Sequence, residues 1–199
     1  MSGIIGSRLN HRGSGLTGSL GTDGQLLTSA GAGLSAVYEN VAAGTGKVLQ
    51  VITDTTTTQS TTTSSDWQDA DLTVTITPAS SSNKVFVMIS TTTDNRVHDT
   101  GCGIGIDRSG GASGDGQLGG QDWGLTRNHY PWNQTYPTSY PNDDNPAHAI
   151  YVDSPGVATA VVYKFQFRAK GVHTVGVQTG STTSSLTVME IEGKNPHLL

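Results

Sequence analysis

Alternation of apolar and polar residues is the clearest signal in the sequence, and it predicts β-strands. Residues 72–77 (LTVTIT) place Leu72, Val74 and Ile76 on one face, as a strand with one buried side requires. Residues 84–90 (KVFVMIS) are nearly all apolar, which is typical of a strand buried on both faces. A turn segment rich in serine separates the two strands, so we expect either a hairpin or a corner of a sandwich.

Further strands are expected along the chain, separated by segments rich in turn residues. The polar segment 54–65 is either a long loop or an edge strand with both faces wet. Residues 101–122 form a glycine-rich loop, broken by a short strand candidate at 103–107. Residues 123–146 hold several prolines and cannot form an interior strand, because proline lacks the N–H that a sheet needs. The remaining strands are expected at 47–53, 148–153, 158–169, 172–178 and 186–191.

This succession of strands, with no expected helix, predicts an all-β fold. We expect an antiparallel β-sandwich of jelly-roll type. The composition agrees, because Gly, Ser and Thr fill more than a third of the 199 residues and both Gly and β-branched Thr disfavour helices. A domain of about 150 residues buries about 70% of its unfolded surface, so the core needs no disulfide or metal.

Residues 1–46 differ from the rest, since glycine recurs every few positions with single apolar residues between. This pattern is too sparse for a core, and such a segment becomes ordered when it lies on another surface. The sequence therefore predicts a docking arm at 1–46 and a β-sandwich domain at 47–199. Self-association within a trimer, or disorder, are the alternatives for the arm. The residues expected to contact its partner, apolar ones in grooves and arginines on carboxylates, are Ile4, Ile5, Arg8, Leu9, Arg12 and Leu16.

Charge and cysteine content exclude several classes of partner and site. The net charge of −5 argues against a nucleic-acid partner, which needs a basic surface. Cys102 is the single cysteine, which excludes an internal disulfide and a thiolate-rich zinc site. The sequence has no apolar run as long as a membrane span and no apolar segment in its first residues that resembles a secretory signal. We therefore expect folding in a cytoplasm and no membrane insertion.

Four segments of the chain stand out together in their order. They are SGIIGSRLNHRGSGLTGSLGTDGQLLTSAGAG at the start, LTVTITPASSSNKVFVMIS at 72–90, YVDSP followed by TAVVYKFQFRA, and SSLTVMEI near the end. In this order they resemble structural proteins of marine bacteriophages, especially cyanophage-like podoviruses. The resemblance implies a virion component of the fibre or head-surface type, with a β-rich outer domain and commonly a trimer. It supplies no catalytic residues, and the segment 93–146 departs from it, as expected of a variable exposed loop.

Motifs for catalysis, cofactors and metals are weak. Gly114, Gly116 and Gly119 match GxGxxG, but a dinucleotide site needs a strand before this motif and a helix after it. A flexible loop is therefore expected there. The six histidines have no helical i,i+4 pair, and the carboxylates around Trp67 and at Asp143 and Asp144 lack calcium-loop spacing. We predict no catalytic residue, no cofactor and no metal.

An aromatic loop is the strongest candidate for a binding surface. Exposed Trp and Tyr stack on sugar rings and anchor protein interfaces at low entropic cost. We expect either a contact loop for a glycan, a host surface or a neighbouring subunit, or a small satellite core that packs over one end of the sandwich. Its residues are Trp123, Tyr130, Trp132, Tyr136 and Tyr140.

Together these features predict a non-enzymatic structural protein on the virion surface, attached by its arm to other virion proteins. A capsid decoration or head fibre is favoured, because the chain is short and has no long shaft repeat. A short tail fibre that binds a host glycan or protein is the first alternative, and a carbohydrate-binding β-sandwich module is the second. A homotrimer is expected, because closed symmetric assemblies hide strand edges and raise avidity for repeated receptors.

Overall fold

A computed structural model describes residues 8–10, 17–19, 25–28, 37–40, 47–95, 101–119, 122–129, 144–171 and 173–193. By its contacts the chain divides into two units, Met1–Gly44 and Thr45–Leu199. The described part of the first unit consists of two short antiparallel pairs. In one, β1 (Arg8–Asn10) pairs with β2 (Thr17–Ser19), and in the other, β3 (Gln25–Thr28) pairs with β4 (Val37–Asn40).

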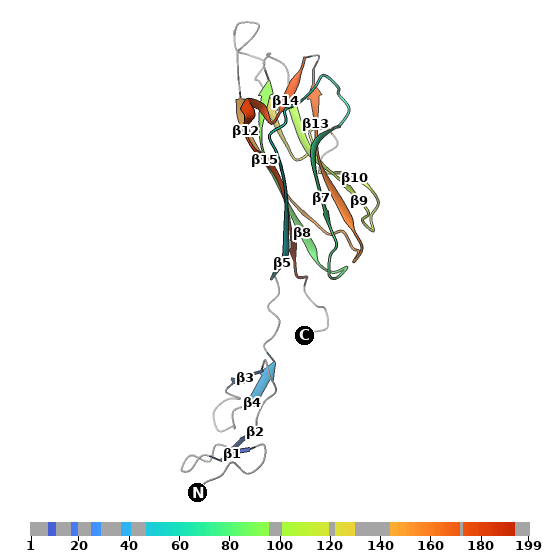
Figure 1. Ribbon diagram of the computed structural model, residues 1–199. Helices are drawn as coiled ribbons and strands as arrows, with labels where there is room; N and C mark the ends of the chain where they lie inside the picture. Colours follow the sequence, from blue (N-terminus) through green and yellow to red (C-terminus); the bar gives the residue numbers. More distant parts are fainter. Residues whose placement is uncertain are drawn as a thin grey trace. The chain divides into compact units, whose positions relative to one another are not determined.

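The second unit is a sandwich of two antiparallel sheets, which confirms the predicted fold class (Figure 1). The first sheet has the order β10-β9-β13-β7, with β11 also paired to β9. Its strands are β7 (Gln68–Ile76), β9 (Gly101–Ser109), β10 (Gly116–Leu118), β11 (Thr126–His129) and β13 (Val161–Lys170).

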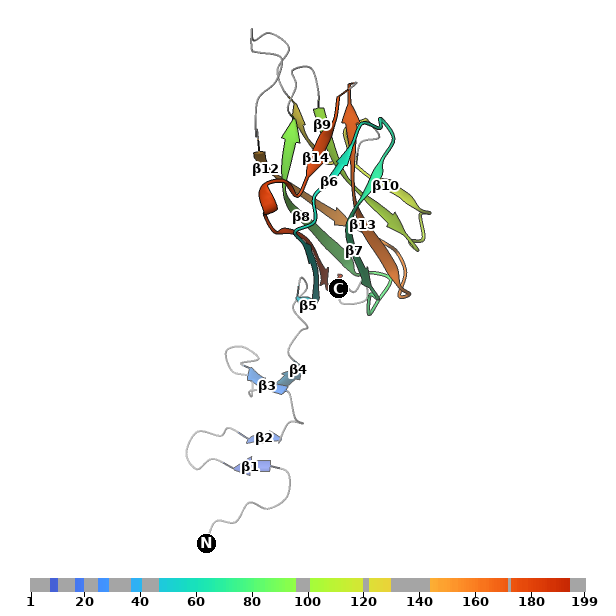
Figure 2. The same cartoon turned by 45° about the horizontal axis from the view of Figure 1, so that its top comes forward.

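The second sheet has the order β5-β15-β8-β14-β6, and β12 also pairs with β8. Figure 2 shows the short strands β6 and β14 side by side. A single 3-10 turn, η1 (Thr179–Ser181), connects β14 to β15. The strands of this sheet are β5 (Val48–Thr56), β6 (Ser60–Thr62), β8 (Lys84–Asn95), β12 (Asp144–Asp153), β14 (Val175–Val177) and β15 (Ser184–Ile191).

The core lies between the two sheets. It is built from the side chains that point inward, which are every second residue along the strands. Leu72, Val74 and Ile76 are buried on one face of β7, as the alternation predicts. Tyr163 and Phe165 of β13 are fully buried beside them, on the neighbouring strand. Each such side chain contributes about 1.5–3 kcal/mol through the apolar surface that it removes from water.

The structure settles several expectations about single strands. The segment between β7 and β8 is a corner of the sandwich, because the two strands belong to different sheets. β8 is buried on one face only, since Phe86 and Met88 are partly exposed, so the prediction of burial on both faces is wrong.

Within 54–65, β5 continues to Thr56 and β6 forms an edge strand. Pro146 lies in β12, whose described ladder is with β8 alone, as the missing N–H requires.

Hydrogen bonds from side chains to backbone connect the two sheets where β5 lies near β7. Asp54 Oδ2 of β5 accepts from the Thr73 N–H at 2.9 Å. Gln50 Nε2 of β5 donates to the Thr77 carbonyl at 2.9 Å, just past the end of β7. A charged side chain on an edge strand also hinders pairing with a foreign strand. We call this region the seam, and it holds both edges in place.

Glu190 of β15 forms a second connection between the sheets. It is 1% exposed, and its Oε1 accepts from the Ala79 N–H at 2.7 Å and from Asn83 Nδ2, while its Oε2 accepts from Gln50 Nε2 at 2.6 Å. Burial alone would raise the pKa of Glu190, but the hydrogen bonds from Asn83, Gln50 and Ala79 outweigh it and hold the pKa below its ordinary value.

We expect Glu190→Gln to lower the free energy of unfolding by about 1–3 kcal/mol at pH 7, because its amide donor would face the donor of Gln50. The folded-state pKa of Glu190 is depressed, so its contribution is present above the unfolded pKa and is lost as pH falls through the folded pKa. Urea denaturation at pH 7 and pH 3 measures both effects. The difference in free energy of unfolding between wild type and Glu190→Gln should be smaller at pH 3 than at pH 7. Asp66→Asn, at an exposed position, is the control. A gap that stays constant would contradict the ionised role of Glu190.

Candidate functional site

The best-defined candidate site lies on the outer face of the five-stranded sheet, around Trp123. This residue belongs to the turn that leads from β10 into β11, and its indole is partly buried. The guanidinium carbon of Arg127 lies 4.7 Å from the ring centroid, and Lys170 Nζ lies 5.2 Å from it. Lys170 also forms an ion pair with Asp122. The indole is therefore fixed between strands β11 and β13 by two cations.

A second indole covers the glycines of β9 on the same face. A Cβ added to Gly105 would lie 3.1 Å from Trp67 Cη2, and a Cβ added to Gly124 would lie 2.7 Å from it. Arg168 of β13 places its guanidinium carbon 5.5 Å from the Trp67 ring centroid. Glycine is required at these positions because a Cβ would press on the indole, and at Gly105 it would also lie 2.2 Å from Gln117 Nε2. This explains why a continuous strand forms in the segment 101–109, where the sequence predicts mostly loop.

The charges on this face are mixed and largely paired. Gln166 and Lys164 donate to Asp69 at 2.7 and 3.0 Å, and the hydrogen bond from Gln166 is the main reason why the pKa of Asp69 is lowered. A hydrogen bond from Lys170 lowers the pKa of Asp122. Burial raises the pKa of Asp107, and the charge of Asp69 adds to this effect. A face that combines indoles, guanidinium groups and carboxylates can bind a polar ligand through hydrogen bonds and ring contacts.

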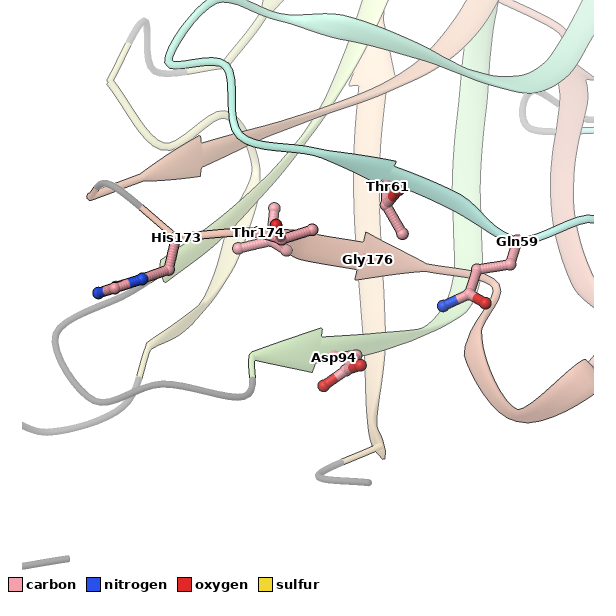
Figure 3. Close-up of a pocket in the computed structure, with 7 residues that line it drawn as sticks. Gln59, Thr61, Asp94, His173, Thr174 and Gly176 are labelled. Carbon is pink, nitrogen blue, oxygen red and sulfur yellow. The ribbon is translucent and has the colours of Figure 1, made fainter. Parts of the chain in front are cut away.

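A hollow of about 510 Å³ lies on the other sheet. Figure 3 shows Asp94 on one side of β14 and Thr61 on the other, with Gly176 between them. Gly176 has no side chain to fill the hollow, and a Cβ at this position would lie 3.1 Å from Thr179 Cγ2. The hollow offers a carboxylate, an imidazole, an amide and hydroxyl groups, which suit a ligand rich in hydroxyls. Its lining residues are Gln59, Thr61, Asp94, His173, Thr174, Val175 and Gly176.

The structure places only some of the residues predicted from the sequence. Trp123 lies in the site described above, and Arg8 and Leu9 lie in β1, where they pair with Ser19 and Gly18. The GxGxxG segment contains strand β10, and within the described residues no helix follows it. The predicted residues outside the described part of the chain are Ile4, Ile5, Arg12, Leu16, Tyr130, Trp132, Tyr136 and Tyr140.

Sequence reasoning missed the partners of Trp123 on this face. Arg127, Arg168 and Lys170 carry no motif, and Trp67 lies among aspartates that lack the spacing of a calcium loop. The usable signal was the alternation GCGIGI at 101–106, in which every outward position is glycine. Such a strand leaves space for a large side chain from elsewhere in the chain.

Comparison with known proteins does not assign this site. No protein-family model matches the chain, and no curated protein matches it significantly. Within the described ranges, no group of three or more His, Cys, Asp or Glu side chains is arranged to hold a metal ion. The same residues include no helix with the length and apolar character needed to cross a bilayer.

Proposed function

We propose that this protein is a non-enzymatic structural component of a bacteriophage surface, attached through residues 1–46 and presenting the sandwich outward. A capsid decoration or head fibre is the preferred form. The observation that carries the proposal is the contrast between the two units. The described parts of Met1–Gly44 are strands of three or four residues, whereas Thr45–Leu199 has a continuous core. Together with the resemblance of several segments to phage structural proteins, this contrast supports an arm that docks and a domain that projects.

The chemistry of the sandwich suits a protein exposed outside a cell. The only cysteine, Cys102, is fully buried, and burial raises the pKa of its thiol to about 12. A buried thiol in its protonated form resists oxidation and disulfide exchange. The sandwich therefore has no need of a reducing compartment.

We propose other virion proteins and further copies of this chain as partners, with the homotrimer as the favoured assembly. The tail-fibre alternative is supported by one feature, the Trp123 cluster, because exposed cations beside an indole can contact host glycans. In that case the cluster would be the receptor-binding surface.

Locating the protein on purified particles tests this proposal. Heads and tails are separated and quantified by mass spectrometry, and intact particles are labelled with immunogold. We expect many copies per particle and label over heads. Label confined to tails would replace the head form by the tail fibre, and absence from particles would overturn the virion role.

A binding assay tests the role of the arm. Arg8→Glu should abolish rebinding of the purified protein to particles that lack it, because a guanidinium–carboxylate contact is replaced by repulsion. Lys84→Glu, which makes the same charge change on the sandwich, should rebind normally. Equal rebinding of the two variants would contradict docking through Arg8.

A further inference from the structure

The outward side chains of the six-stranded sheet form continuous rows across four strands. Met189 of β15 lies directly opposite Val51 of β5 and Phe86 of β8. Phe86 in turn lies opposite Val152 of β12, so one row consists of four apolar residues. Residues directly opposite each other across antiparallel strands have Cβ atoms about 4.5–5.5 Å apart, which makes the row contiguous.

The neighbouring rows continue this surface. In the next row Thr187 lies opposite Thr53 and Met88, and Met88 lies opposite Ile150. The row after it consists of Thr55, Ser185, Ser90 and His148. We call these three rows the uncharged face. It contains no Lys, Arg, Asp or Glu, and charge returns only at the ends of the sheet, with Lys84 at one end and with Asp94 opposite Asp144 at the other.

Three of the six apolar residues of the uncharged face are largely exposed in the isolated chain, and Phe86, Met88 and Met189 are partly exposed. Val51, Ile150 and Val152 are 55%, 57% and 51% exposed, which is unusual for large aliphatic side chains in adjoining rows. Single exposed apolar residues are ordinary on a protein surface, but a contiguous group of them marks an interaction surface.

The opposite sheet has the contrary character. Its outward positions include Asp69, Asp107, Lys164, Arg168 and Lys170. Lys164 forms an ion pair with Asp69, and Lys170 forms one with Asp122. A charged partner placed on the uncharged face would lose hydration and gain no counter-charge. The uncharged face therefore fits a partner surface that is flat, apolar at one end and free of charge. Among the described surfaces, the one that best meets these conditions is the same face of a second copy.

We propose that the uncharged face is the surface through which copies of this chain associate. Four strands about 4.8 Å apart and three rows about 6.8 Å apart give the face roughly 400 Å² in plan, about half of the ~800 Å² per partner of a standard interface. The seam favours the face over the strand edge, because Asp54 occupies the edge of β5. Three copies that each turn this face toward a common three-fold axis bring it against the same face of both neighbours and form a closed assembly. This inference rests on the proposed function for its setting, since it supplies the contact surface of the proposed homotrimer.

The mass of the full chain in solution tests this inference. Sedimentation velocity and light scattering between 1 and 100 µM should give a mass of more than one copy for the wild type, with three copies of 20.7 kDa each for the proposed homotrimer. Ile150→Lys and Val51→Lys should each weaken association at least 100-fold, because a cation would be buried without a partner. Thr75→Lys is the matched control, since Thr75 is an exposed strand residue on the other sheet, and it should leave the mass unchanged. Circular dichroism checks that every variant folds.

Cross-linking identifies the occupant of the face. A photoreactive residue at position 150, in mixed ¹⁴N- and ¹⁵N-labelled protein, should give links to β5, β8 or β12 of another copy. Links to residues 1–46 would overturn the inference in favour of the arm as occupant. A wild type that is monomeric at 100 µM, or an Ile150→Lys variant that associates as well as Thr75→Lys, would also overturn it.

These results are independent of the location on particles. A monomer found on particles would remove the self-association surface and leave the virion role. An assembled protein that is absent from particles would remove the virion role and leave the self-association surface.

Discussion

Replacing Arg108 with methionine is expected to lower the free energy of unfolding by about 3–5 kcal/mol. Arg108 Nη1 donates to both carboxylate oxygens of Asp153, at 3.2 and 3.4 Å, and Nη2 donates to Ser113 Oγ at 2.8 Å. The two side chains are only 7% and 6% exposed. Without the guanidinium, the carboxylate stays buried and loses its counter-charge, which water cannot replace.

The large effect follows from the position of this ion pair between the sheets. Arg108 belongs to β9 in one sheet, and Asp153 ends β12 in the other. Tyr163 of β13 donates its hydroxyl to Asp153 Oδ2 at 2.7 Å. Burial, with the adjacent Asp153, raises the pKa of Tyr163, so its phenol is a hydrogen-bond donor at pH 7. Loss of Arg108 therefore disturbs three strands at once.

Urea denaturation followed by circular dichroism measures this effect. Lys164→Met is the control, because it removes a cation from an exposed ion pair with Asp69 and should cost less than about 1 kcal/mol. The double variant Arg108→Met with Asp153→Leu should be more stable than Arg108→Met alone, since it also removes the uncompensated charge. A loss below 1 kcal/mol for Arg108→Met would contradict the structural role of the pair.

The second large effect is expected for Gly124→Ala, with a loss of about 2–5 kcal/mol. Gly124 has φ of 67°, a left-handed conformation that costs about 1–2 kcal/mol for a residue with a Cβ. The new Cβ would also lie 2.3 Å from the Ile104 carbonyl oxygen and 2.7 Å from Trp67 Cη2. Because the carbonyl belongs to the backbone of β9, it cannot move aside, and overpacking adds about 1–3 kcal/mol.

Gly114→Ala separates the two causes. Gly114 has φ of 86°, but a Cβ there would meet nothing within 4 Å. This variant should therefore lose only the conformational part, about 1 kcal/mol. Thermal unfolding monitored by tryptophan fluorescence measures both variants and also detects displacement of Trp67. Equal losses for Gly114→Ala and Gly124→Ala would show that the indole does not pack on the glycines.

The fold class could be predicted because its signal is local. The alternation at 72–77 and the apolar segment at 84–90 each determine a strand from adjacent residues alone. The strand at 101–109 could not be predicted fully, because its glycines accommodate Trp67, a residue more than 30 positions earlier in the chain. Local conformational preference predicts a loop for such a glycine-rich segment, and the tertiary contact with Trp67 is what makes it a strand.

The candidate site shows the same division between local and distant information. Trp123 could be selected as an aromatic residue in a loop, but its contacts with Arg127 and Lys170 depend on the pairing of β11 and β13 with opposite edges of β9. The ion pair of Arg108 with Asp153 joins residues 45 positions apart in different sheets. Neither pairing has a spacing rule in the sequence, since register is set by the whole sheet.

The buried thiol of Cys102 has a practical consequence for the study of this protein. Burial raises the pKa of this thiol to about 12, so the thiol is protonated at pH 7, and the thiolate is the form that reacts with maleimides. The native chain should therefore give almost no background with maleimide dyes. Cysteine introduced at an exposed position such as Thr75 becomes the sole reactive handle, so fluorophores can be attached one per chain and the copies on a single particle counted by stepwise photobleaching.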